Sequence, residues 1–326
     1  MRRFLLASRA AIFGWLLAGC AATPNSVETS LAPSAPATTA PFLNGDQSFQ
    51  FAVMGDRTGG ARPGVFNRSV EAVNRLQPDF VMSVGDYIEG YTEDLHKLTS
   101  EWDEVDNALA NLDMKFFRVV GNHDVSNTAM ADLWSQRYGD PYYSFVRKDV
   151  LFLALSTEDP FVELPADITA RQAAFKEAFA ADPEGTQARV LEAVKGRPDP
   201  VRLPGSVNIS AKQIAFVKDT LAAHRDVRWT MIFMHKPAWA YDSAAFAEIE
   251  TLLSDRPYTV IAGHEHYYEH DVRNGRDYFT MATCGGVWLK DGPGRLDHTL
   301  WITMTDDGPV FANIRIDGIS GKSGPR

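Results

Sequence analysis

The sequence predicts an α/β fold in which strands and helices form layers, and three observations lead to this prediction. Short apolar runs alternate with stretches of helical periodicity along most of the chain. Several of the apolar runs end abruptly in Asp, Asn or His. Near the carboxyl end, Asn274-Gly275 and Asp307-Gly308 lie between apolar runs and predict antiparallel hairpins. Such alternation, closed by hairpins, is typical of a layered α/β domain.

Each predicted element has a local signal. The predicted strands are short apolar runs at residues 49–54, 79–84, 116–120, 143–146, 151–155, 229–234 and 258–262. The predicted helices have apolar positions at helical spacing and cover about residues 64–77, 93–112 and 210–224. Pro63 suits the start of the first helix, and Ser210 suits the N-cap of the last.

Residues 157–208 interrupt the alternation. The stretch is polar and rich in proline, although its middle, about residues 168–194, favours helix. We interpret it as an insertion into a domain that spans residues 48–318, and expect it to form a cap near the functional site.

The first 47 residues do not belong to the predicted domain. Residues 1–19 combine a basic start with an apolar run that is too short for comfortable membrane spanning, as in a signal peptide. The run ends in Leu17-Ala18-Gly19-Cys20, which resembles the bacterial lipobox and implies cleavage before Cys20 and lipidation of its sulfur. Residues 20–47 are rich in Ala, Pro, Thr and Ser, so we expect a tether.

These features predict an exported protein anchored to a membrane by an N-terminal lipid. Ala21 follows the lipidated cysteine where an inner-membrane retention signal would have Asp, which favours the periplasmic face of the outer membrane. The other cysteine, Cys284, would have no disulfide partner, so stability must come from the core or from bound metal.

The charge balance argues against nucleic acid as a partner. The chain has 42 acidic and 32 basic residues and a formal net charge of -10. Such a surface repels polyanions at long range. An anionic substrate would therefore need local positive charge from a metal ion or an arginine.

Six polar residues follow the ends of apolar runs. They are Asp56, Asp86, Asn122, His235, His264 and His266. Each alone is typical of a turn, a helix cap or a surface loop. Together they predict one crevice, because ligands gather at the carboxyl ends of strands in α/β sheets. Oxygen ligands mixed with imidazoles suit Mn, Fe or Zn, and a shared carboxylate can bridge two such ions.

The order and spacing of these motifs resemble the calcineurin-like metallophosphoesterase superfamily, including its purple acid phosphatase relatives. The motifs are Gly55-Asp56, Gly85-Asp86, Gly121-Asn122-His123-Asp124, His235 and Gly263-His264-Glu265-His266. The resemblance implies two packed mixed β-sheets flanked by helices, and a hydrolase that acts on small phosphate esters. It also implies two divalent or trivalent metal ions as cofactors.

The resemblance assigns roles by position. Asp56, Asp86 and His266 would hold the first metal. The second would be held by Asp86, Asn122, His235 and His264, with Asp86 as the bridge. His123 would protonate the leaving group or stabilise charge on the phosphoryl group, and Asp124 of the same motif is also a candidate catalytic residue.

Three positions after these motifs leave alternatives open. Thr58 stands where the family usually has a histidine ligand, so the first metal site is expected to be weak. Glu89 either replaces that ligand or orients His123 as a catalytic partner. Arg57 either binds the substrate phosphate or forms an ion pair with a neighbouring carboxylate. The alternative to an enzyme is accordingly a metal-binding scaffold lipoprotein of the same fold.

Overall fold

The computed structural model describes residues 47–195 and 206–323. The predicted signal peptide, Cys20 and all but the last residue of the predicted tether lie outside the described residues. Within the described part of the chain, no helix is both long enough and apolar enough to cross a membrane.

Five strands form the first sheet, and its order is β13-β12-β1-β2-β3. Their bounds are β1 Phe49–Met54, β2 Phe80–Ser83, β3 Lys115–Phe117, β12 His298–Thr305 and β13 Gly308–Arg315. β1, β2 and β3 run parallel, whereas β12 is antiparallel to both β1 and β13. The sheet is therefore mixed.

Six strands form the second sheet, in the order β10-β11-β9-β8-β5-β4. Their bounds are β4 Tyr143–Arg147, β5 Val150–Ala154, β8 Trp229–Phe233, β9 Tyr258–Ala262, β10 Glu269–Arg273 and β11 Arg276–Thr280. β11, β9, β8 and β5 are parallel, and the two edge strands are antiparallel to their neighbours. The hairpins predicted at Asn274-Gly275 and Asp307-Gly308 are confirmed as β10–β11 and β12–β13.

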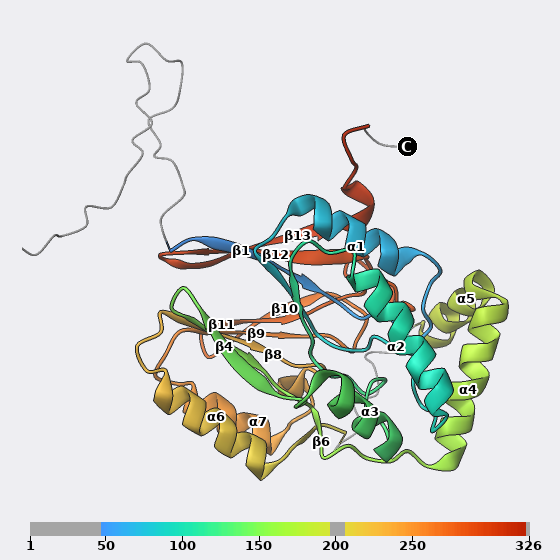
Figure 1. Ribbon diagram of the computed structural model, residues 1–326, viewed down its shortest axis with the longest axis horizontal. Helices are drawn as coiled ribbons and strands as arrows, with labels where there is room; N and C mark the ends of the chain where they lie inside the picture. The colour runs from blue at the N-terminus through green and yellow to red at the C-terminus, as the bar shows by residue number, and fades with distance from the viewer. Residues whose placement is uncertain (1–46, 196–205, 324–326) are drawn as a thin grey trace, which may run out of the picture. The chain divides into compact units, whose positions relative to one another are not determined.

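The two sheets pack face to face, and helices cover their outer faces (Figure 1). Phe51, Phe152 and Phe233 are fully buried between the sheets. Helices α1 Val65–Leu76, α2 Leu95–Leu109 and α3 Thr128–Tyr138 pack on the first sheet. Helices α6 Ala211–Ala223 and α7 Ala244–Leu252 pack on the second. The predicted two-sheet α/β fold is confirmed.

One local prediction is confirmed, and one short helix was missed. The hydroxyl of Ser210 accepts a hydrogen bond from the amide of Gln213 at 3.1 Å, so the predicted N-cap of α6 is confirmed. Helix α7 was not predicted. It is only nine residues long, and it is capped by Ser243.

The segment at 157–208 contributes two helices and two short strands. These are β6 Glu158–Asp159, α4 Ala166–Ala181, α5 Pro183–Val194 and β7 Asn208–Ile209. The helices coincide with the stretch predicted as helical, and they form a hairpin whose turn is capped by Asp182. In Figure 1 this hairpin lies beside α2, and Lys176 of α4 pairs with Glu101 of α2 at 3.5 Å.

Candidate metal centre

The six predicted ligands lie together, because each follows a strand whose carboxyl end meets the others at one edge of the two sheets. Asp56 follows β1, Asp86 follows β2, Asn122 follows β3, His235 follows β8, and His264 and His266 follow β9. The parallel strands of both sheets thus deliver ligands to a single place, as expected for α/β sheets.

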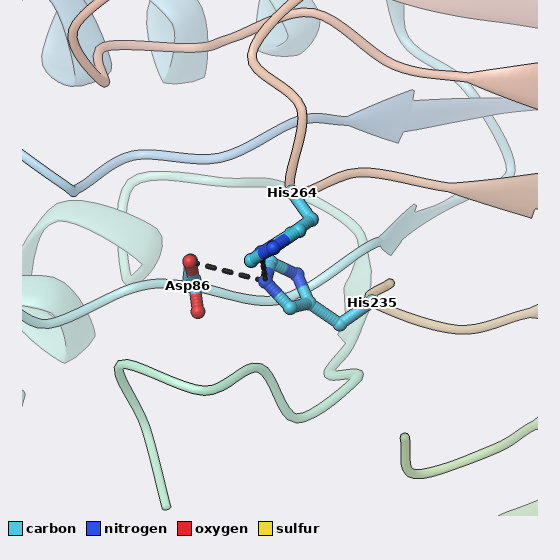
Figure 2. A group of neighbouring side chains, drawn as sticks. All are labelled: Asp86, His235 and His264. Carbon is cyan, nitrogen blue, oxygen red and sulfur yellow. Dashed lines mark hydrogen bonds and ion pairs between the residues drawn. The ribbon is translucent and has the colours of Figure 1, made fainter. Parts of the chain in front are cut away.

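One cluster, called here the second group, consists of Asp86, Asn122, His235 and His264. Figure 2 shows three of its side chains facing one another. The Nε2 atom of His235 lies 3.1 Å from Asp86 Oδ2 and 3.1 Å from His264 Nδ1. It also lies 3.0 Å from Asn122 Oδ1. The four donor atoms therefore converge on one point.

The other cluster, called here the first group, consists of Asp56, Asp86 and His266. Their ligand atoms lie within 4.8 Å of one another, and all three residues are buried. The Nε2 atom of His266 is 3.8 Å from Asp56 Oδ1. Because Asp86 belongs to both groups, its carboxylate can bridge two ions.

The chemistry of these atoms fits metal cations. The carbonyl of Val84 lies 2.8 Å from His235 Nδ1 and can only accept, so that nitrogen donates and Nε2 faces the other ligands. Burial lowers the pKa of His264 well below its ordinary value and that of His266 to about 4, so both rings are neutral and offer lone pairs. Asp56 Oδ2 is buried without a hydrogen-bond donor among the described residues. A cation is the partner that such converging acceptors lack.

A proton competes for part of this centre. Burial disfavours charge on His235, but the carboxylates of Asp86 and Asp56 outweigh burial and raise the pKa of His235 to about 9. Metal binding to the second group must therefore displace a proton from this ring.

The backbone of three of the candidate ligands is strained. Asp86, His264 and His266 have φ values of 60°, 72° and 50°, in the left-handed region that non-glycine residues seldom adopt. Each such residue costs about 1–3 kcal/mol and persists where the surroundings enforce it. Gly121 is also required, because a Cβ there would lie 2.2 Å from Asp86 Oδ1.

His123 stands beside the centre on a fixed backbone. Its amide donates to Asp86 Oδ1 at 2.9 Å, and its ring Nδ1 lies 3.0 Å from the main-chain carbonyl of Glu89. Since a carbonyl only accepts, Nδ1 donates. The other ring nitrogen, Nε2, points toward Gly59 of the loop that follows Asp56.

Comparison with known proteins gives the family. The model of the calcineurin-like phosphoesterase family matches residues 49–268. The chain belongs to the calcineurin-like phosphoesterase family. Among the curated proteins, none matches this sequence.

Solved structures share the fold of this phosphoesterase domain at low identity. A dimetal phosphatase from Danio rerio is 15% identical with a TM-score of 0.53, over 81% of this chain and 98% of its own. A purple acid phosphatase from yellow lupin is 11% identical with a TM-score of 0.58, over 86% of this chain and 53% of its own. GAP50 of Plasmodium, described as an anchor in the inner membrane complex, is 14% identical with a TM-score of 0.53, over 84% and 86%.

The structure corrects the catalytic role predicted for Asp124. Its carboxylate is fully buried and faces main-chain amides instead of the reacting side of the centre. Oδ2 accepts from the amides of Asp86 and Gly121 at 2.9 Å each, and Oδ1 accepts from the amide of Tyr87 at 2.9 Å. Asp124 therefore holds together the two loops that carry Asp86 and Asn122, as a positioning residue.

The predictions for Glu89 are corrected in a similar way. Its carboxylate accepts from the amides of Gly60 at 3.1 Å and Ala61 at 2.8 Å, and it belongs to neither ligand group. Burial raises the pKa of Glu89, but the charge of His123 and the Ala61 amide more than offset burial, and the pKa lies below its ordinary value. Glu89 orients His123, but through its main-chain carbonyl. Its carboxylate instead fixes the loop that follows Asp56.

Of the two roles left open for Arg57, the structure shows the ion pair with a neighbouring carboxylate, and no contact of its guanidinium with the ligand groups is found among the described residues. One guanidinium nitrogen donates to Glu104 at 2.5 Å and another donates to the carbonyl of Tyr87 at 2.7 Å. The side chain also lies over the ring of Phe66. These contacts turn the guanidinium toward Glu104 on α2 and the Tyr87 carbonyl.

Sequence reasoning missed two features beside the centre. The hydroxyl of Tyr91 accepts from Asn122 Nδ2 at 2.6 Å, and its ring meets that of His123 edge-on with centroids 4.6 Å apart. Lys236 and Glu158 form a buried ion pair at 2.7 Å. The position of Lys236 directly after His235 was a possible signal, whereas nothing in the loop around Tyr91 distinguished that residue.

The ligand counts predict two unequal metal sites. The first group offers three donors and the second four, because Thr58 supplies no imidazole. In calorimetric titration of stripped protein, we expect one tight and one weaker binding event. His266→Ala should remove the weaker event and His264→Ala should weaken the tighter one. Two equally tight sites in the wild type would contradict the assignment.

Proposed function

We propose that this protein hydrolyses phosphate esters with a pair of transition-metal ions held by the two ligand groups. The observation that carries the proposal is the shared position of Asp86 in both groups. When bound, such ions supply Lewis acidity toward a phosphoryl group and a nucleophile near neutral pH. Membership of the calcineurin-like phosphoesterase family supports the same reaction class.

The chain's own residues would bind and orient the ester and move one proton. The negative charges of Asp56 and Asp86 would hold the cations. Bound cations would in turn attract the anionic ester, which the protein's net charge of -10 would otherwise repel. His123 donates through Nδ1 to Glu89, which leaves Nε2 to deliver a proton to the departing oxygen or to hydrogen-bond the phosphoryl group. Tyr91 holds both Asn122 and the His123 ring in place.

The test joins metal content to turnover. Protein stripped of metal and reloaded with Mn, Fe or Zn should bind two ions per chain and release phosphate or alcohol from aryl phosphate mono- or diesters. A scaffold lipoprotein with a lost first site is the alternative, and Thr58 is the observation that favours it. One ion or none, with no turnover under any of the three metals, would support that alternative.

A cavity beside the second group is suited to the organic part of an ester. Its volume is about 400 Å³, and Tyr91, Ile168, Tyr241 and the ligands Asn122 and His264 lie on its wall. On the described part of this wall, Lys236 is the positively charged side chain. Its charge is paired with Glu158, and its amine also donates to the carbonyl of Ser206 at 2.7 Å. The proposed occupant is therefore an uncharged, partly apolar group.

Placing a charge on this wall should affect large substrates selectively. Ile168 is half-buried on α4. Ile168→Asp should lower kcat/KM for an aryl phosphate by about tenfold or more, because an unpaired carboxylate must be desolvated when the ring binds. Hydrolysis of ethyl phosphate should change little, and Ile168→Leu is the matched control. Equal losses on both substrates would exclude the cavity as the binding place of the organic group.

A further inference from the structure

The α4–α5 hairpin contacts three loops that surround the first group. These are residues 57–62 after Asp56, residues 87–91 after Asp86, and residues 283–288, one of which orients His266. We propose that this hairpin is a clamp that positions the ligands of the first metal. The inference rests on the proposed metal centre, and it assigns to the insertion a role in metal affinity.

Gln187 of α5 makes two hydrogen bonds to the third of these loops. Its side-chain amide donates to the carbonyl of Trp288 at 3.0 Å and accepts from the amide of Trp288 at 2.8 Å. Gln187 is only 8% exposed, so both hydrogen bonds are shielded from water. A side chain that satisfies both main-chain groups of one residue fixes that residue's position and orientation.

The fixed residue is next to the one that orients a metal ligand. The carbonyl of Val287 accepts from Nδ1 of His266, which turns Nε2 of that ring toward Asp56. Such a partner sets both the tautomer and the direction of a ligating imidazole. Displacement of Trp288 would therefore move Val287 and rotate the His266 ring.

The opposite side of the same loop is anchored by Arg62. Its guanidinium donates to the carbonyl of Gly286 at 3.0 Å and lies 3.9 Å from the centre of the Trp288 indole. The amide of Gly286 also donates to the carbonyl of Asp56 at 3.2 Å. The loop is thus held on one side by the segment that carries Asp56 and on the other by the hairpin.

Helix α4 holds the remaining two loops. Phe175 and Phe179 pack against Gly60, where a Cβ would lie 3.1–3.2 Å from their rings. The amine of Lys176 donates to the carbonyl of Gly90 at 3.0 Å. Gly60 and Gly90 lie on either side of the hydrogen bonds between Glu89 and the loop of residues 57–62, so α4 packs over these hydrogen bonds.

The first group has particular need of such support. It has three donors, so its affinity depends strongly on how well they are already arranged before the ion binds. In the second group, His235 is oriented by a partner outside the three loops, the carbonyl of Val84. The contact of the clamp through Gln187 and Trp288, which leads to His266, should therefore act on the first metal and spare the second.

The test is Gln187→Met, which keeps side-chain length and helix propensity but removes both hydrogen bonds. In calorimetric titration of Mn or Zn into stripped protein, the first site should weaken by about tenfold, the lower end of the range for changes around metal ligands. The second site should keep its affinity. His266→Ala identifies which binding event belongs to the first site.

Two further variants complete the design. Glu192→Met, at a position on α5 with a 76% exposed side chain, is the matched control and should leave both affinities unchanged. The carboxylate in Gln187→Glu can still accept from the Trp288 amide but cannot donate to the Trp288 carbonyl. This variant should therefore also weaken metal binding at the first site, and it provides the test if Gln187→Met fails to fold. Unchanged affinity, or equal weakening of both sites, would overturn the clamp. Because the readout is metal binding, two bound ions without turnover would refute the proposed hydrolase and leave the clamp standing.

Discussion

Asp86→Asn should remove most of the bound metal and lower turnover by about three orders of magnitude. The substitution keeps the size of the side chain, and its oxygen can still accept from the amide of His123. It removes the one negative charge that the two ligand groups share. A loss of about 4 kcal/mol in charge stabilisation at a metal centre corresponds to this fall in rate. Metal content by mass spectrometry and phosphate release measure the two effects.

The matched control for this variant is Asp140→Asn, which removes a carboxylate from an exposed position. It should leave both metal content and turnover at the wild-type level. If Asp86→Asn retained activity close to that of the wild type, the reaction would have to take place elsewhere on the protein.

His123→Ala should leave metal binding largely intact and lower the rate by about two to four orders of magnitude for an ester with a poor leaving group. The ring contributes no atom to either ligand group, and its contact with Asp86 is made by the main-chain amide, which alanine retains. The loss should be much smaller for a nitrophenyl ester, since nitrophenolate departs without protonation.

The comparison between the two leaving groups is the decisive measurement for His123. His270→Ala is the matched control, because His270 lies exposed on β10 and pairs with Asp277 at 2.8 Å, away from the ligands. If His123→Ala reduced the rates of both esters equally, His123 would stabilise charge or bind substrate and would not act as the proton donor.

The sequence alone determined the features that have a local physical cause. Apolar runs of strand length ended in Asp, Asn or His, and parallel strands bring such ends together, so the place of the centre followed from the pattern. The Asn274-Gly275 and Asp307-Gly308 hairpins followed from residues that tolerate positive φ. The helices of the insertion and its place near the site were expected from the sequence, although the particular contacts that it makes with the loops around the centre were not.

Only the tertiary structure decided which partner each polar side chain meets, because those partners are distant in the sequence. Arg57 follows the candidate ligand Asp56, yet it donates to Glu104, 47 residues away, and to the carbonyl of Tyr87. Asp124 lies within the motif that carries Asn122 and His123, yet its carboxylate lies among buried amides that need acceptors, one of them that of Asp86, 38 residues away. Gln187 meets Trp288 across 101 residues. A buried polar group must find a partner wherever the fold supplies one, and no local pattern encodes that choice.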